Sequence, residues 1–539
     1  MRDLGAARFV LVALLSACNP SQHTTSSGSA TGSAAPVAHG AHLSISCDAS
    51  VQAAFDRGFV SLHNMDYARA RTTFSEAAAT QPTCGMLFWG LAMSYFQPLW
   101  AGKPSAAALA SGTEAVAKAR AAQASPRERE YIAAVAAFYD DAPDYATRLQ
   151  HWVAAQRQLA AHAPDDLEAQ AFSAMARLSV LDKKDKTYAE SIAVATLLEA
   201  LLKQRPDHPG VMHYLIHAYD NPLLAPKGLE LARAYAASAP EAAHAIHMPS
   251  HIYARLGVWS GVVESNIKSG DAARKRPVDG KVSRDLVHAT DYLTYGYLQL
   301  GEDDKAQATM QELDPATEYE LNSGPGAYGL AAAPARYALE RRQWAEAAAL
   351  VVKRVPYDWE HYPWAEAVSH AARGLGAARN KDANAAAVEL AELERLKPLI
   401  EAMWWQQHVQ IEHDVIAAWI AHDRGDDAKA EPLMRSAADR DLASGKDNVE
   451  PGHVISAIEE YGDLLIELKR PKDALTMFEK ALVESPLRLN ALYGAGHAAE
   501  LANLPDVAKR YYTQLVASTS ASSTRPARAS AQAWLASHH

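Results

Sequence analysis

Apolar residues recur along most of this chain at the three- and four-residue spacing of amphipathic helices. The alternation of apolar and polar residues that marks half-buried strands does not recur. Hydrophobic residues make up 49% of the sequence, alanine is abundant, and the aromatic residues are scattered. Stacked amphipathic helices have this composition, so we predict an all-α protein.

The chain has 539 residues, and the roughly 500 that follow its N-terminal segments exceed what one ordinary hydrophobic core supports. Certain residue types recur at the same relative positions in several parts of the chain, and this repetition shows how the chain is organised. One copy has Gly58, Ala70, Phe74, Ala77 and Pro82, a second has Gly462, Leu465, Ala474, Phe478, Ala481 and Pro486, and a third has Leu492, Gly496, Ala508 and Tyr512. Small residues let two antiparallel helices approach closely, the aromatic ring fills the wedge between them, and proline ends the second helix.

These offsets resemble the tetratricopeptide repeat. The resemblance implies a superhelical solenoid of roughly ten to twelve antiparallel helix pairs. We predict the array over residues 43–440, with histidine-rich repeats at 207–300. A solvated spacer at 441–452, C-terminal repeat pairs at 453–525 and a tail at 526–539 complete this organisation.

The N-terminus has the features of an export signal. A basic residue precedes an apolar run from Phe9 to Leu15, and the small residues before Cys18 follow a bacterial lipobox. We therefore predict a lipoprotein signal peptide over 1–18, lipidation at Cys18, and a flexible tether over 19–42. A plain cleaved signal is the alternative. The expected location is therefore exported, lipid-anchored and facing the periplasm. Asn19, which follows the lipobox cysteine, slightly favours the outer membrane over the inner one.

The net charge and the cysteines indicate which binding partners and which cellular compartment to expect. The net charge is −11 and no basic run occurs, which argues against nucleic acid and leaves the lipid as the only predicted membrane contact. Cys47 and Cys84 remain after lipidation. In an oxidising compartment such a pair favours a disulfide, which would bracket the first repeat, whereas two separate thiols are the alternative.

Histidines and carboxylates fall on one predicted stripe of three successive helices, at positions that line the concave groove of tetratricopeptide arrays. The register of the three helices is set by Pro206, by Pro240, and by Gly301 with Ala306. The stripe contains His213, His217 and Asp220, then His244, His247 and His251, then His288, Asp291 and Tyr295.

This stripe could hold metal. Two histidines four residues apart lie about 6 Å apart along a helix and can share a cation with a ligand from the next helix. The predicted ligands are His213, His217, His247, His251 and Asp291, for one metal ion with an open position or for two ions sharing Asp291. Imidazole and carboxylate suit Zn, Cu, Fe or Ni. The string HYLIH lacks the glutamate of HExxH, which argues against a zincin-type peptidase.

Two alternatives compete with the metal site. The stripe could be a metal-free groove that binds a partner through Asp220, His244, His288, Tyr295 and Arg336, or it could be a structural hydrogen-bond network. If Pro249 began a separate helix, His244 and His247 would leave the stripe.

The strings PGVMHYLIHAYDNP and AIHMPSHIYARLGVWSGVVESN resemble segments of a broad family of exported bacterial tetratricopeptide repeat lipoproteins. The resemblance implies the fold and the exported location but no reaction. We predict a lipid-anchored scaffold that binds a protein or peptide partner in its groove. The alternative is a metal-dependent enzyme or metal-binding protein that uses the histidines and aspartates of the stripe.

Overall fold

The computed structural model describes residues 40–100, 103–239, 241–277, 279–314, 316–320 and 323–538. The predicted signal peptide with Cys18, and residues 19–39 of the predicted tether, lie outside these ranges. Gly40 and Ala41, which the sequence assigns to the end of the tether, pack against the helices instead. Ala41 is buried, and Arg205 donates a hydrogen bond to the carbonyl oxygen of Gly40.

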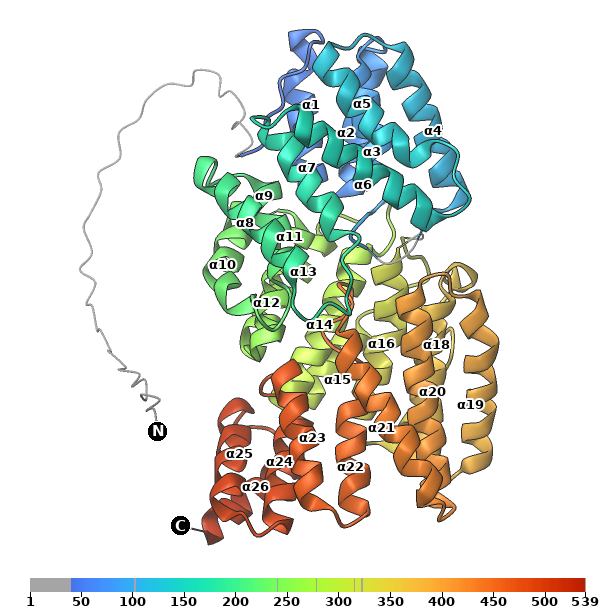
Figure 1. Cartoon of the computed structure of the whole chain (residues 1–539), viewed down its shortest axis with the longest axis vertical. Coiled ribbons are helices and arrows are strands. Elements are labelled where there is room, and N and C mark those ends of the chain that lie inside the picture. Colours follow the sequence, from blue (N-terminus) through green and yellow to red (C-terminus); the bar gives the residue numbers. More distant parts are fainter. Residues whose placement is uncertain are drawn as a thin grey trace, which may run out of the picture. The chain divides into compact units, whose positions relative to one another are not determined.

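The described chain is all α-helical (Figure 1), which confirms the predicted tetratricopeptide repeat solenoid. The first helices are α1 (Ala49–His63), α2 (Tyr67–Thr80), α3 (Gly85–Ser94), α4 (Ala106–Ala121), α5 (Pro126–Tyr139), α6 (Tyr145–His162), α7 (Leu167–Leu178) and α8 (Ala189–Gln204). The next are α9 (Pro209–Tyr219), η1 (Ala225–Gly228), α10 (Leu229–Ser238), α11 (Ala243–His247), α12 (Pro249–Leu256), α13 (Trp259–Arg274), α14 (Arg284–Leu300) and α15 (Asp303–Gln311).

The second half continues this pattern. It comprises α16 (Gly324–Glu340), α17 (Trp344–Ala348), η2 (Trp359–His361), α18 (Pro363–Arg379), α19 (Ala383–Leu396), η3 (Lys397–Leu399), α20 (Met403–Asp423), α21 (Asp427–Ser444), α22 (Ala457–Glu467), α23 (Pro471–Glu484), α24 (Leu489–Leu501), α25 (Pro505–Ser518) and α26 (Pro526–Ser537). The helix α26 occupies the predicted tail, and its Trp534 is buried. None of the described helices is long and apolar enough to cross a membrane.

In the predicted repeat pairs, neighbouring helices pack closely where a glycine of one helix lies against an aromatic ring of the next. A Cβ atom at Gly58 would lie 2.8 Å from the ring of Phe74, and one at Gly90 would lie 2.5 Å from the same ring. Phe478 stands in the same relation to Gly462 and Gly494. Because real Cβ contacts are longer than this, only glycine allows the helices to pack so closely around the aromatic wedge.

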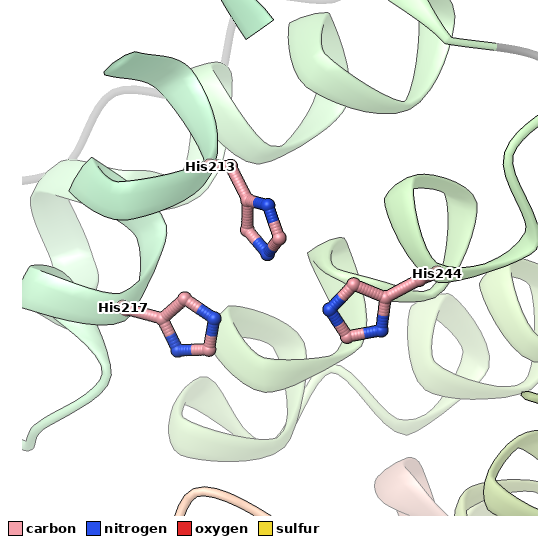
Figure 2. Close-up of side chains that lie close together, drawn as sticks. All are labelled: His213, His217 and His244. Carbon is pink, nitrogen blue, oxygen red and sulfur yellow. The ribbon is translucent and has the colours of Figure 1, made fainter. Parts of the chain in front are cut away.

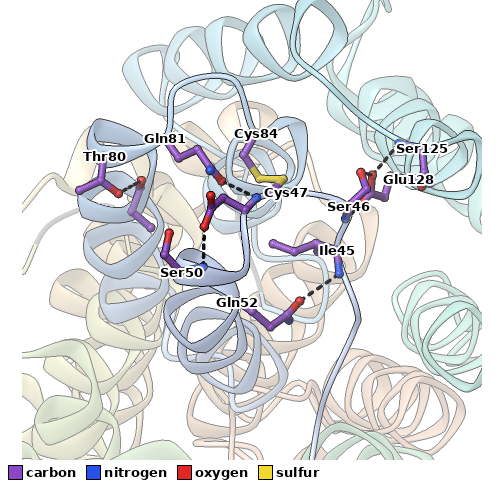
Figure 3. Close-up of a disulfide and its surroundings, with 12 residues drawn as sticks. Ile45, Ser46, Cys47, Ser50, Gln52, Thr80, Gln81, Cys84, Ser125 and Glu128 are labelled. Atoms are coloured by element: carbon purple, nitrogen blue, oxygen red, sulfur yellow. Dashed lines mark hydrogen bonds between the residues drawn. A yellow bond between two sulfur atoms is a disulfide. The ribbon is translucent and has the colours of Figure 1, made fainter.

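The predicted disulfide is present. Cys47 and Cys84 are bonded, and the link ties the segment before α1 to the start of α3 (Figure 3). Next to it, Glu128 accepts hydrogen bonds from Ser46 and from the backbone of Ser125, the N-cap of α5. The alternative of two separate thiols is therefore wrong.

We expect the variant Cys47→Ser/Cys84→Ser to loosen α1 and α2 without unfolding the array. Losing a link across 37 residues costs about 3 to 4 kcal/mol, and in a repeat array this loss stays local. Amide hydrogen exchange should therefore rise in α1 and α2 and stay unchanged in α22 to α25. Global unfolding on reduction would contradict this expectation.

The chain between α21 and α22, residues 445–456, differs most from its prediction. It was expected as part of a solvated spacer, but α21 continues to Ser444 and Glu450 is fully buried. His453 lies between Asp441 and Glu450. Although burial lowers the pKa of His453, these two carboxylates raise it to about 9. His453 is therefore charged and pairs with both carboxylates inside the protein.

Candidate metal centre

The helix α9 presents the first histidine pair. His208 caps it by accepting the backbone N–H of Val211 at Nδ1, and Pro209 occupies the first turn, where no N–H is needed. All residues of α9 are buried. His213 and His217 lie one turn apart on the same face, with ring centroids 5.0 Å apart.

The second group lies on α11 and α12. Pro249 does begin a new helix, as the alternative supposed, but Met248 before it keeps helical backbone angles (φ −52°, ψ −35°). The helical turn of the backbone therefore continues from α11 through Met248 into α12. His244, His247 and His251 stay on one face, and the rings of His247 and His251 are 5.0 Å apart.

The helix α14 brings His288 against this group, with ring centroids of His288 and His247 4.3 Å apart. Six histidines thus meet in two sets of three. Ligand atoms of His213, His217 and His244, which we call site 1, lie within 4.8 Å of one another (Figure 2). Those of His247, His251 and His288, called site 2, do the same.

The two sites adjoin each other. The ring centroids of His217 and His251 are 5.7 Å apart, and those of His244 and His247 are 5.8 Å apart. All six side chains are at most 8% exposed. The structure brings the four predicted histidine ligands together and adds His244 and His288, which the sequence assigns to the groove.

Three of the six rings are oriented by a bond at Nδ1. His213 donates to the carbonyl oxygen of His63 at 2.8 Å, and His251 contacts Asp220 at 3.0 Å. His247 lies 2.7 Å from the Oδ1 of Asn266, whose amide nitrogen donates to Val262. Each Nδ1 therefore carries the hydrogen, which leaves the Nε2 lone pair facing the cluster. Metal-binding histidines in proteins are oriented in this way.

The two Nε2 atoms of His247 and His251 are only 3.1 Å apart. Since both rings carry their hydrogen at Nδ1, two lone pairs face each other across this distance. Such a contact is repulsive unless a cation or an added proton lies between them.

Other ring nitrogens also lack partners. Within the described residues, no hydrogen-bond partner reaches Nε2 of His213, either nitrogen of His217 or His244, or Nδ1 of His288. A buried polar atom without a partner costs about 1 to 3 kcal/mol. A bound metal ion would satisfy these lone pairs.

The environment keeps the rings neutral, which is the form that binds metal. Burial is the main cause and lowers the pKa of His213 to about 3. It also lowers the pKa of His217, His244, His247 and His288 well below the ordinary value, and neighbouring histidines add to the effect.

Asp220 supports site 2 without being available to a metal. Its Oδ1 accepts from Arg255 at 2.9 Å, and its Oδ2 accepts from His251 and from Lys446 of the 445–456 segment at 2.7 Å. Burial raises the pKa of Asp220, but Lys446 and Arg255 bring it well below its usual value. The carboxylate is therefore ionised and fully used.

The structure does not bring Asp291 to either set of histidines. It lies fully buried against Arg336, with Oδ1 2.9 Å from Nε. Arg336 also donates to the carbonyl oxygen of Gly452 at 2.6 Å and to Tyr328. The prediction of Asp291 as a shared ligand is wrong, because an arginine from α16 takes its place as the partner.

The residues expected to contact a partner in the groove are covered by the chain itself. Asp220, His244, His288, Tyr295 and Arg336 are all at most 9% exposed. Tyr295 accepts a hydrogen bond from Arg488. The predicted stripe thus lies inside the protein, where the 445–456 segment covers part of it.

A third cluster, His63, Glu168 and His208, was not foreseen. Both histidines donate to Glu168, at 3.1 and 2.9 Å, and Nδ1 of His63 accepts from Tyr214. Burial raises the pKa of Glu168, but these bonds lower it to about 2. All four ring nitrogens of the two histidines make hydrogen bonds, so this cluster offers no free ligand atom to a metal. Its role is to position His213, which donates to the carbonyl oxygen of His63. Its signal in the sequence is His208 directly before Pro209, where a helix is expected to begin.

A cleft of about 230 Å³ reaches the centre. It is lined by residues from the 98–100 loop, from 178–191, from 217–222 and from 444–448, together with Arg255 and Glu484. Of the six histidines, His217 belongs to this lining, next to Asp220 and Lys446. Trp100 also lines the cleft, and its ring lies 5.0 Å from that of His244.

Comparisons with known proteins find only similarity of fold. No protein-family model and no curated protein sequence matches the chain. Similar solved structures include human IFIT1 (12% identity, 87% of this chain, 95% of that chain, TM-score 0.39) and yeast Tom70 (12%, 91%, 96%, 0.27). A tetratricopeptide repeat protein from Parabacteroides merdae has 13% identity, 65% and 98% coverage, and a TM-score of 0.27. Likeness this low carries no information about function.

Proposed function

We propose that this protein binds transition-metal ions in a centre of six histidines, one ion at site 1 and one at site 2. The orientation of the rings carries the proposal. Three rings are held at Nδ1 by His63, Asp220 and Asn266, so that Nε2 faces inward. Most of the other ring nitrogens have no hydrogen-bond partner among the residues that the structure describes.

The ligand chemistry favours borderline metals. Neutral imidazole suits zinc, copper, nickel and iron, whereas calcium and magnesium prefer oxygen ligands. Three nitrogen ligands leave a fourth position of a tetrahedral site open, as in zinc sites that bind a further ligand. The binding of metal is therefore the function that the geometry supports best.

We expect close to two metal ions per chain when the protein is purified without chelator or affinity-tag histidines, as measured by elemental mass spectrometry. His213→Ala/His217→Ala should lose one ion and His247→Ala/His251→Ala the other, because each pair removes two of three ligands. His408→Ala, which removes a buried histidine outside the centre, should keep both.

A folded wild-type chain that takes up none of zinc, copper, iron or nickel would contradict the proposal. Circular dichroism of each variant separates loss of metal from loss of the fold. If His408→Ala lost as much metal as the double variants, the binding would not belong to this centre.

The proposed location is exported, with a lipid anchor at Cys18 facing the periplasm, the outer membrane being slightly favoured. The disulfide between Cys47 and Cys84 supports an oxidising compartment. A protein or peptide partner stays a prediction of the repeat fold. Such a partner would bind away from the buried stripe.

A further inference from the structure

The charge around the centre would be unbalanced once metal is bound. Each divalent ion would bring two positive charges, and all its ligands at either site are neutral imidazoles. The buried carboxylates beside the sites are already paired. Asp220 faces Lys446 and Arg255, and Asp291 faces Arg336. Uncompensated charge in a buried place is costly, so the loaded centre requires an anion.

The cleft shows where such an anion would enter. Its lining contains His217, which is one of the ligands of site 1. It also contains Lys446 and Arg255, the two cations that pair with Asp220. Its volume of about 230 Å³ is below the roughly 300 to 1,000 Å³ of pockets for drug-sized ligands. The ligand is therefore small.

We propose that a metal ion at site 1 keeps one coordination position open to this cleft and binds a small anion there, beside Lys446 and Arg255. The inference rests on the metal-binding function proposed above. It adds a ligand class, a small inorganic or carboxylate anion, and it makes the two sites unequal. Site 1 contributes His217 to the cleft lining, whereas none of the three rings of site 2 belongs to that lining.

The test uses the full chain loaded with cobalt(II), whose visible absorption changes when an anion binds to the metal. Azide is the probe. We expect azide to change the spectrum in a saturable way in the wild type. Asn448→Trp should weaken azide binding at least tenfold, because Asn448 is half-buried in the cleft lining and a large ring there would fill the cleft.

Asn448→Ala is the matched control and should stay within twofold of the wild type, because it removes volume instead of adding it. Lys446→Met should weaken azide binding about fivefold by removing one of the cations beside the site. Lys183→Met serves as its control. Lys183 also lines the cleft, but its partner is Asp447, whereas the partner of Lys446 is Asp220, which holds His251 of the centre. The loss of Lys183 should therefore change azide binding less than twofold.

Cobalt content measured on each sample separates the two proposals. Bound cobalt with a spectrum that azide leaves unchanged would overturn the anion site and leave metal binding intact. Equal azide affinity in Asn448→Trp and Asn448→Ala would overturn the cleft as the route. A folded chain that binds no cobalt would overturn both proposals.

Discussion

The metal-free protein is expected to lose much of its stability as the pH falls from 7.5 to 5.5. Burial lowers the pKa of His213 to about 3, and it lowers the pKa of His217, His244, His247 and His288 well below 6.5. In the unfolded chain these rings titrate near 6.5. Their contribution is therefore intact above this pH and is lost below it, because only the unfolded chain then takes up the protons.

The magnitude is large. At pH 5.5 each such histidine costs about 1.4 kcal/mol, so five cost about 7 kcal/mol, against a typical total stability of about 5 to 15 kcal/mol. Part of this loss is opposed by the buried carboxyls of Asp285 and Asp291, whose pKa burial raises to about 6. It is also opposed by His453, whose pKa is lowered by burial but raised to about 9 by Asp441 and Glu450.

Urea unfolding at pH 7.5, 6.5 and 5.5 measures the effect on chelator-treated protein. The variant His217→Gln/His244→Gln should lose about 2 to 3 kcal/mol less than the wild type, because two titrating rings are gone. A stability that stays level from pH 7.5 to 5.5 would show that the folded rings accept protons, which contradicts their burial.

The second large effect is expected for Arg336→Met. This change leaves the carboxylate of Asp291 without its counter-ion in a place where both side chains are fully buried. It also removes the donor to the carbonyl oxygen of Gly452 in the 445–456 segment. Breaking one half of a buried ion pair costs about 3 to 5 kcal/mol, to be measured by urea unfolding at pH 7.5.

Two comparisons locate the cause. Arg336→Met/Asp291→Asn should recover a large part of the loss, because no unpaired charge remains. Arg341→Met, at the end of the same helix, removes an arginine whose pair with Glu346 is partly exposed and should cost less than about 1 kcal/mol. Equal losses for Arg336→Met and the double variant would show that the packing of Arg336, and not its charge, matters.

Much of the site was predictable because it depends on short-range helical geometry. His213 with His217, and His247 with His251, lie four residues apart, and a helix places such residues on one face whatever surrounds it. The positions of Gly58 and Phe74, and of Gly462 and Phe478, predicted the helix pairs for a similar reason. Only glycine permits the approach that the aromatic ring requires.

The assignment of Asp291 failed for a reason that helical spacing cannot reveal. Its register position was as expected, but Arg336 from α16 reaches it first and binds it as an ion pair. The burial of Glu450 and Lys446 was missed in the same way. A polar sequence between two helices predicts a solvent-exposed loop. Burial of its charged side chains becomes possible when distant helices supply partners of opposite charge, which lower the cost of burial.

By itself, then, the sequence determined the all-α repeat, the helix pairs and the common face of the histidines, because these follow from contacts within one or two turns or between neighbouring helices. The tertiary structure alone decided how those histidines divide into two sites, which carboxylates are taken by arginine or lysine, and that the 445–456 segment covers the stripe. Those outcomes depend on side chains such as Asp220 and Lys446, more than 200 residues apart, whose meeting no local spacing encodes.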